Sequence, residues 1–447
     1  MRVLFVSGNR EKLPDAVIPL GMLYVIASTP AHHEREWIDL CFESYPEQAL
    51  RDAVRAAQPG LVALGMRNIQ NNDYSGIGDN LSYYAGLIGS VREVSSAPIV
   101  LGGAGFSVMP SELMRRLGPD FGIAGEGERA LPALLDALEN ETELAAVPGL
   151  HWRAGDEIRA NPPAARFLDL DAVAEPDRGL VDPRYYARYA TDAVQTKRGC
   201  PLRCDYCTYP IIEGRVGRTR GPERVVDEMF RAVERQPDIR HVFIVDSVFN
   251  LPRAHAKGVC RELIRRRWSI PWTCYANPLG FDAEMAELAR AAGCAGMEIG
   301  SDSGCDEVLT RMRKGFKTED IRRIHGLCAD AGIRDCHTFI LGTHGETIDD
   351  VARTLDFASE LDPFGAIFMI WVDDHESVEP ELRTARAALR GEIAELLRAR
   401  AARHPHWASP SLGINFSRKL FRQMRRAGLH GPLWQHVRGA SPAAATL

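Results

Sequence analysis

The sequence of 447 residues contains neither a long apolar run nor an excess of positive charge. A transmembrane helix needs about 20 consecutive apolar residues, and no stretch of the sequence comes near that length, so we expect no membrane partner. The formal net charge is −6, and the basic stretch near the C-terminus is interleaved with alanine, leucine and glutamate. Such interleaving is typical of a solvated helix face, so we also expect no nucleic-acid partner.

Paired cysteines and a signal peptide are missing as well. Seven of the ten cysteines are scattered singly, as expected for small core residues of a protein in a reducing compartment. Residues 1–6 form a strand-like segment rather than a secretory leader. We therefore expect a cytoplasmic globular protein, long enough for two or three domains.

The other three cysteines, Cys200, Cys204 and Cys207, lie in one short loop with the spacing C-x3-C-x2-C. Gly199 and Pro201 make the loop tight, so its three thiolates can converge on one point. Three ligands on a cubane of four irons leave one iron free to bind a small molecule through amino and carboxylate groups. A zinc site usually takes four ligands, and a disulfide would leave an odd cysteine. The spacing therefore favours an iron–sulfur cluster.

Residues 197–210 closely resemble the cluster-binding motif of radical S-adenosylmethionine (SAM) enzymes, including the aromatic Tyr206 before the third cysteine. The resemblance implies a [4Fe-4S] cluster and SAM as cofactors, and a reductant such as flavodoxin or ferredoxin. It also implies reductive cleavage of SAM to a 5′-deoxyadenosyl radical, which abstracts hydrogen from a small-molecule substrate.

Residues 1–140 alternate strand-like and helix-like segments, which predicts an α/β domain with a doubly wound parallel sheet. Ligands of such sheets bind at the carboxyl ends of the strands. The segment resembles the cobalamin-binding domain that precedes the radical SAM domain in one large subgroup. The residues that carry this resemblance are Pro19-Leu20-Gly21, Gly102-Gly103 after a strand, and Gly125-Glu126-Gly127-Glu128.

One feature of many cobalamin proteins is missing, the D-x-H-x-x-G motif that supplies a histidine to cobalt. The nearest histidines, His32 and His33, lie between a helix and the next strand. Cobalamin therefore remains a possible cofactor, and we expect no histidine to ligate its cobalt. Arg67 follows a predicted strand, and its cation could occupy the face of the corrin where no histidine arrives; a salt bridge at the strand end is the alternative.

The remainder of the chain is predicted in three parts. Residues 141–190 are rich in proline and aspartate and are expected to form a linker. Residues 191–375 are expected to form the partial (β/α)6 barrel of radical SAM enzymes, and residues 376–447 a helical C-terminal cap. The six barrel strands are predicted at 193–196, 241–245, 272–275, 296–299, 335–340 and 366–370.

Polar residues at the carboxyl ends of these strands are the candidate site, because active sites of barrels lie there. Residues 298–304 resemble the strand that approaches the ribose and carboxylate of SAM, and residues 340–343 resemble a strand that lines the adenine pocket. With Tyr206, the predicted SAM contacts are Glu298, Ser301, Asp302 and Thr343.

Three further residues are candidates for the acid that protonates a leaving hydroxyl group. Tyr209 lies immediately beyond the cluster loop, and Asp246 and Asp374 lie at predicted strand ends. These roles presuppose radical 1,2-diol dehydration of an amino sugar in antibiotic biosynthesis, the reaction of an aminoglycoside enzyme with this architecture. Acidic strand ends suit a cationic amino sugar. A separate downstream reductase would then reduce the keto product.

Diol dehydration is favoured by the absent cobalt-ligand motif and by a chain that ends soon after the barrel. The alternative is a cobalamin-dependent radical SAM C-methyltransferase of natural-product biosynthesis, the common activity among proteins with this domain order. A third alternative is a non-catalytic iron–sulfur sensor. The complete barrel pattern around the cysteine loop argues against a sensor.

Overall fold

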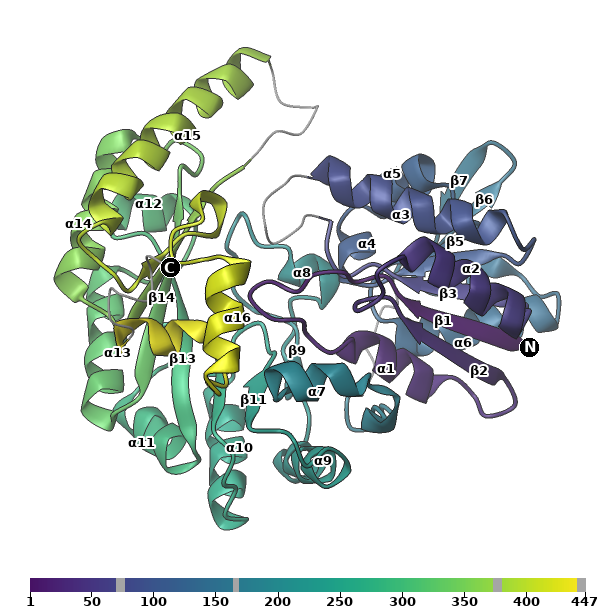
Figure 1. Cartoon of the computed structure of the whole chain (residues 1–447), viewed down its shortest axis with the longest axis horizontal. Coiled ribbons are helices and arrows are strands. Elements are labelled where there is room, and N and C mark those ends of the chain that lie inside the picture. Colours follow the sequence, from purple (N-terminus) through teal and green to yellow (C-terminus); the bar gives the residue numbers. More distant parts are fainter. Residues whose placement is uncertain (70–76, 164–168, 373–379, 440–447) are drawn as a thin grey trace. The chain divides into compact units, whose positions relative to one another are not determined.

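The computed structural model describes residues 1–69, 77–163, 169–372 and 380–439 (Figure 1). The chain divides into two compact units, each built around a seven-stranded sheet. The first unit comprises residues 1–187, 208–220 and 231–237, and the second comprises residues 188–207, 221–230 and 238–447. No helix within the described ranges is long and apolar enough to cross a membrane.

The first sheet has the strand order β2-β1-β3-β4-β5-β6-β7. Its first five strands run parallel, which confirms the predicted doubly wound sheet. They are β1 (Arg2–Ser7), β2 (Glu34–Asp39), β3 (Leu61–Gly65), β4 (Ile99–Gly102) and β5 (Phe121–Ile123).

Helices cover both faces of this sheet (Figure 1). Successive residues of a strand point to opposite faces, so a doubly covered strand must be apolar throughout. On β1, Val6 packs on the side of Leu87, whereas Phe5 packs on the side of Leu134. The covering helices are α2 (Pro46–Ala57), α3 (Ile77–Arg92) and α5 (Pro110–Leu117) on the first face, and α1 (Leu20–Ser28) and α6 (Gly127–Glu139) on the second.

The region expected to be a linker contributes two strands to this sheet. β6 (Leu150–Ala154) pairs antiparallel with β5, and β7 (Glu157–Ala160) pairs antiparallel with β6. Gly155 has a φ of +64° in the turn between them, a conformation that glycine adopts without steric cost. The two strands have only five and four residues. They lie next to Pro- and Asp-rich segments, so the composition of the region is that of a loop. The composition of this region therefore predicts a connector and gives no sign of the strand pairing.

The second sheet is all parallel, with the strand order β16-β15-β14-β13-β12-β11-β8. All six predicted strands are present, and a short strand from the C-terminal region adds a seventh. The strands are β8 (Thr191–Val194), β11 (His241–Ile244), β12 (Trp272–Ala276), β13 (Cys294–Asp302), β14 (Arg334–Leu341), β15 (Gly365–Ile370) and β16 (Trp407–Ala408).

Helices seal the outer face of the second sheet. On this outer face Phe339 and Phe368 are fully buried, and they pack in one cluster with Leu355 and Leu397 of two covering helices. The residues that alternate with them along β14 and β15 point to the opposite, inner face. Several of these residues keep accessible surface. The helices that follow the strands are α10 (Arg253–Arg265), α11 (Ala283–Ala291), α12 (Asp306–Arg311), α13 (Thr318–Ala331), α14 (Ile348–Leu361) and α15 (Pro380–Ala401).

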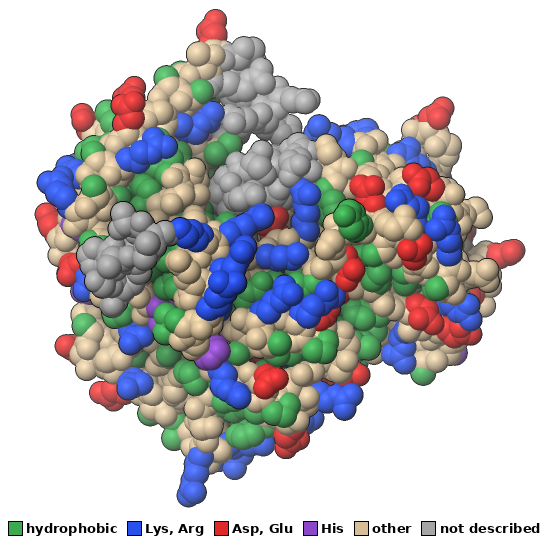
Figure 2. Space-filling view, viewed as in Figure 1, with side chains coloured by type: hydrophobic (Ala, Val, Ile, Leu, Met, Phe, Trp, Pro, Cys, Tyr) green, Lys and Arg blue, Asp and Glu red, His purple; other side chains and the backbone are tan. Residues whose placement is uncertain are grey.

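The C-terminal region adds α16 (Arg418–Arg426) and the 3-10 helix η4 (Leu433–Gly439). Helix α16 buries Phe421 and Met424 and exposes Arg418, Lys419 and Arg422. Lys and Arg side chains crowd the face of the molecule that carries α16 (Figure 2). The exposed basic face fits the solvated helix that the interleaved sequence predicts.

Candidate functional site

The three cysteines of the C-x3-C-x2-C motif lie in a loop that follows the short strand β9 (Lys197–Arg198). Cys200 is buried, and Cys204 and Cys207 are half-buried. Gly199 has a φ of +85°, which turns the chain sharply into the loop. Three thiols on one short, partly enclosed loop fit the three protein ligands that a [4Fe-4S] cluster of this family requires.

Asp246 fixes the start of this loop. Its Oδ1 accepts hydrogen bonds from the backbone N–H of Thr196 over 2.7 Å and of Lys197 over 3.1 Å, and its Oδ2 accepts from Thr196 Oγ1 over 2.5 Å. The carboxyl is fully buried, and this burial raises its pKa. The predicted role of Asp246 as a proton donor stays a prediction, and the geometry gives it a second role in holding the loop.

The far side of the loop is held by a buried ion pair. Asp302, the last residue of β13, pairs with Lys314, and Tyr206 donates its hydroxyl to the same carboxylate. Lys314 Nζ also lies 3.0 Å from Tyr206 Oη. The backbone N–H of Asp205 donates to Met312 over 3.3 Å. Asp302 and Tyr206, both predicted SAM contacts, therefore meet at the cluster loop.

Lys314 is the charged partner of the loop that sequence reasoning missed. Burial raises the pKa of Cys204, and the nearby Lys314 ammonium opposes that rise. The same ammonium therefore favours the thiolate form that an iron ligand needs. In the sequence Lys314 follows Arg311 and Arg313 in a run that suggests an exposed basic turn, so nothing there distinguished it.

Ser301 and Asp302 point to different sides of β13. The pairing with β14 shifts between Gly300 and Asp302, so Ser301 is the extra residue of a β-bulge. Its Oγ lies 2.7 Å from His337 Nδ1, and His337 Nε2 lies 3.0 Å from Asp335. Asp302 has a φ of +63°. The bulge thus directs Ser301 toward a buried histidine and Asp302 toward the cluster loop.

Glu298 lies four residues before Asp302 on the same strand. Its Oε1 accepts a hydrogen bond of 2.9 Å from the indole N–H of Trp434. Burial raises the pKa of Glu298 to about 7, and the bond from Trp434 opposes the rise. Trp434 comes from the C-terminal region predicted to be a cap, and no local pattern relates two residues that are 136 positions apart.

The remaining predicted site residues are placed as follows. Thr343 follows β14, and its N–H and hydroxyl both donate to Glu346 Oε2, over 2.8 and 3.1 Å. Tyr209 begins the short helix α8 (Tyr209–Ile212) and is 36% exposed; its segment belongs to the first unit. Asp374 lies outside the described residues.

The carboxyl edge of the first sheet has the small residues and unsatisfied donor that a large ligand would need. Gly103 follows β4 with a φ of +100°, and a Cβ there would lie 2.6 Å from the backbone oxygen of Met66. Asn9 follows β1 and is 7% exposed, and its Nδ2 has no hydrogen-bond partner among the described residues. Arg67 follows β3 and is exposed. Gly103 thus lets the loop after β4 pack closely on Met66 at the end of β3, and the Asn9 donor and the exposed Arg67 fit a large polar cofactor such as a corrin at this edge.

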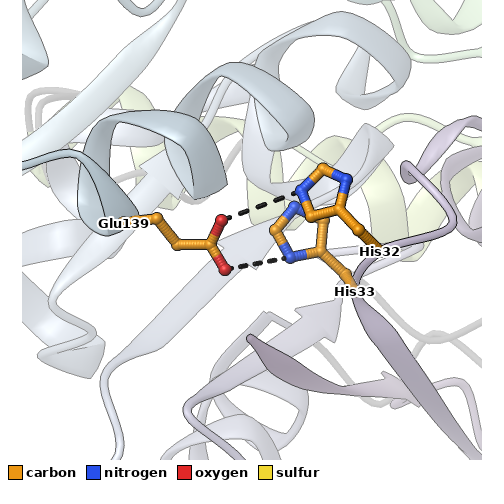
Figure 3. A group of neighbouring side chains, drawn as sticks. All are labelled: His32, His33 and Glu139. Carbon is orange, nitrogen blue, oxygen red and sulfur yellow. Dashed lines mark ion pairs between the residues drawn. The ribbon is translucent and has the colours of Figure 1, made fainter.

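His32 and His33 do not lie at this edge. They precede β2, and Glu139 at the end of α6 forms ion pairs with both, over 3.7 and 3.4 Å (Figure 3). The Met1 ammonium donates to Glu139 over 2.6 Å. The hydrogen bond from that ammonium lowers the pKa of Glu139. The group is therefore an ion-pair cluster at the amino ends of the strands, away from the carboxyl edge where ligands of such sheets bind.

Comparison with known proteins assigns both sheets. Residues 194–358 match the radical SAM superfamily, and residues 7–135 match the B12 binding domain. The chain is 30% identical over 424 residues to the tryptophan 2-C-methyltransferase of Streptomyces laurentii, covering 80% of this chain and 70% of the relative. It is 23% identical to the cytidylyl-2-hydroxyethylphosphonate methyltransferase of Streptomyces wedmorensis, covering 78% of this chain and 75% of that enzyme.

Solved structures agree with this assignment. The radical SAM methyltransferase TsrM from Kitasatospora setae, determined with cobalamin and a [4Fe-4S] cluster bound, superposes with a TM-score of 0.73 at 27% identity. The superposition covers 83% of this chain and 72% of TsrM. The cobalamin-dependent SAM radical enzyme OxsB superposes with a TM-score of 0.67 at 20% identity, covering 88% of this chain and 56% of OxsB, and shares the fold. The chain therefore belongs to the radical SAM superfamily, in the group that carries a B12-binding domain ahead of the radical SAM domain, and its cofactors include a [4Fe-4S] cluster and SAM.

Proposed function

We propose that the protein is a cobalamin-dependent radical SAM methyltransferase that methylates a carbon atom of a small molecule. The observation that carries the proposal is the 30% identity to a tryptophan 2-C-methyltransferase, because that similarity spans both domains. A second methyltransferase and the cobalamin-bound TsrM structure support it over most of the chain. Methyl transfer is thus better supported than the diol dehydration favoured from the sequence, which stays as the alternative.

The residues of the first unit support a bound corrin. The close approach of backbone at Gly103 lies at the edge where the B12-binding domain would hold its ligand. The Nδ2 of Asn9, which has no partner among the described residues, lies at the same edge. Arg67 is exposed at the same edge, so its cation is available to the corrin face that lacks a histidine. When bound, cobalamin supplies a methyl carrier, and the cluster supplies the electron that activates SAM.

The residues of the second unit hold the reacting partners. Asp246 and the Asp302–Lys314 pair fix the cysteine loop from its two sides, so the cluster ligands are ordered before SAM binds. The half-buried positions of Cys204 and Cys207 limit the access of water. An electron donor such as flavodoxin or ferredoxin, a downstream reductase and a cytoplasmic location stay predictions.

Cofactor content tests the proposal. The protein is purified without oxygen, its cluster is reconstituted in the presence of hydroxocobalamin, and corrin absorbance is measured together with iron and sulfide. We expect about one cobalamin per chain alongside four irons. A protein that carries four irons and cleaves SAM but retains no cobalamin would contradict methyl transfer and favour elimination from a hydroxylated amino sugar.

A further inference from the structure

The inner face of the second sheet is largely apolar and partly open. Phe243 of β11 and Tyr275 of β12 point inward with their ring centres 5.1 Å apart, and Tyr275 is 37% exposed although it lies within a strand. On β15, Ile367 and Met369 keep accessible surface, whereas the intervening Phe368 has none. Aromatic and aliphatic walls of this kind bind flat apolar groups.

One end of this inner face is closed by Trp434. Gly296 and Gly365 stand at inward positions near the amino ends of β13 and β15. A Cβ on Gly296 would lie 2.7 Å from the Trp434 ring, and a Cβ on Gly365 would lie 3.5 Å from it. The two glycines make room for the indole, which forms a floor across the amino ends of the strands.

Glu298 is an inward carboxylate midway along β13, whereas Asp302 lies at the carboxyl end of the same strand, beside the cluster loop. Glu298 stands directly above the floor, with Oε1 bonded to Trp434. Among the described residues the side-chain hydrogen bond of Glu298 is the one to Oε1 from Trp434, and the residue is half-buried. The carboxylate therefore presents one free acceptor to whatever occupies this space.

SAM held at the cluster is a poor candidate for that occupant. Glu298 lies four residues before Asp302, and a strand rises about 3.3 Å per residue, so the two side chains are roughly 13 Å apart along β13. Asp302 contacts Tyr206 of the cluster loop. The amino and carboxylate groups of SAM bind the open iron of the cluster, so they cannot also reach the floor.

We propose that the floor of the inner face binds a flat, apolar substrate through one N–H or ammonium group, which donates to the free oxygen of Glu298. The inference rests on the proposed function, because it takes the inner face as the substrate side of a methyl transfer. It replaces the polyhydroxylated, cationic amino sugar expected from the sequence with an aromatic or aliphatic molecule that carries a single donor.

The groups around Glu298 give the interaction a predictable pH dependence. Its neighbours are Tyr275 on β12, Cys336 on β14 and Trp434, and burial raises the pKa of Cys336. The nearest charged residue on the inner side of β14, Arg334, pairs with Gly296 in the strand register and donates to the backbone oxygen of Gln435. Burial raises the pKa of Glu298 to about 7. The carboxylate form is the better acceptor, so a donor should bind about tenfold more tightly at pH 8 than at pH 6.

A pair of isosteric probes tests the proposal on the reconstituted holoenzyme under anaerobic conditions. Indole has one N–H donor, and benzofuran has the same shape without it. Isothermal titration should give tighter binding of indole than of benzofuran, with pH dependence for indole alone. Glu298→Gln should abolish the pH dependence, whereas Glu319→Gln on the exposed side of α13 should leave it intact.

Trp434→Phe is the second variant, because it keeps the carboxylate and removes a hydrogen bond that stabilises its ionised form. Its indole-binding profile should move to higher pH, a shift that a merely structural role would not produce. Equal binding of the two probes, no binding of either, or an unchanged pH profile in Glu298→Gln would overturn the inference. Cobalamin content is measured on the same samples, so failure of the proposed function is recognised separately.

Discussion

Asp302 and Lys314 form an ion pair in which each side chain is only 4% exposed. Removing one partner of a buried pair leaves an uncompensated charge, which typically costs about 3–5 kcal/mol. The pair also receives Tyr206 of the cluster loop. We therefore expect both the stability of the fold and the retention of the cluster to depend on the Asp302–Lys314 pair.

Lys314→Met tests this dependence. We expect a loss of about 3–5 kcal/mol in the free energy of unfolding, together with reduced iron and sulfide content after reconstitution. Arg313→Met is the matched control, because Arg313 is the exposed neighbour, and it should change neither quantity. Asp302→Asn combined with Lys314→Met should recover part of the stability. An equally stable Lys314→Met protein with four irons would show that the pair does not hold the loop.

Two variants of Asp246 distinguish a structural role of this residue from a catalytic one. Asp246→Ala removes the acceptor for two buried N–H groups, and each unsatisfied group costs about 1–3 kcal/mol. We expect lower stability and incomplete cluster loading. Asp246→Asn keeps an acceptor oxygen and should retain the cluster. If both variants load four irons and only SAM turnover falls, Asp246 acts in the chemistry rather than in holding the loop.

Gly103→Ala tests the carboxyl edge of the first sheet. The positive φ and the 2.6 Å approach to the Met66 oxygen leave no room for a methyl group, so the backbone must shift. Corrin absorbance after reconstitution should fall, while iron content should stay at four. Gly89→Ala in α3 has open space around it and should raise stability by up to about 1 kcal/mol. Undiminished corrin binding in Gly103→Ala would place the cofactor elsewhere.

The network of half-buried His325 with buried Asp335 and His337 predicts a pH dependence of stability. His325 Nδ1 lies 2.6 Å from Asp335, and the hydrogen bond to that carboxylate raises the pKa of His325. A histidine whose pKa is raised in the folded state stabilises the fold at pH values below its unfolded-state pKa of about 6.5. This contribution is lost as the pH rises through the folded-state pKa. The difference in unfolding free energy between wild type and His325→Gln, measured in urea, should shrink from pH 6 to pH 9. A constant difference would show that the histidine is uncharged throughout.

Local sequence patterns predicted the cluster loop and the barrel strands, because each of these is formed by residues close together in the chain. The cysteine spacing identified the cluster loop, and apolar runs such as residues 366–370 helped to locate the six barrel strands. Side-chain contacts between segments that are far apart in the chain leave no such pattern in the sequence. Lys314 meets Tyr206 across 108 positions, and the basic run that contains it looks like an exposed turn.

The β-bulge at Ser301 shows a second limit. Alternation along β13 cannot reveal one extra residue, although that residue decides which side chains face the sheet interior. The sequence predicts both Ser301 and Asp302 as SAM contacts and gives no sign that the bulge directs Ser301 to His337 and Asp302 to the cluster loop. The resemblance predicts Glu298 as a SAM contact, and its hydrogen-bond partner Trp434 could be seen only in the folded chain.

The measurement that tests the central claim most directly is the fate of SAM in the reconstituted protein, with and without cobalamin. Under reducing conditions, a cobalamin-dependent methyltransferase releases S-adenosylhomocysteine only when cobalamin is present, and mass spectrometry with SAM labelled in its adenosyl group identifies that product. We predict this cobalamin-dependent S-adenosylhomocysteine. Formation of 5′-deoxyadenosine alone, in equal amounts with and without cobalamin, would contradict the account.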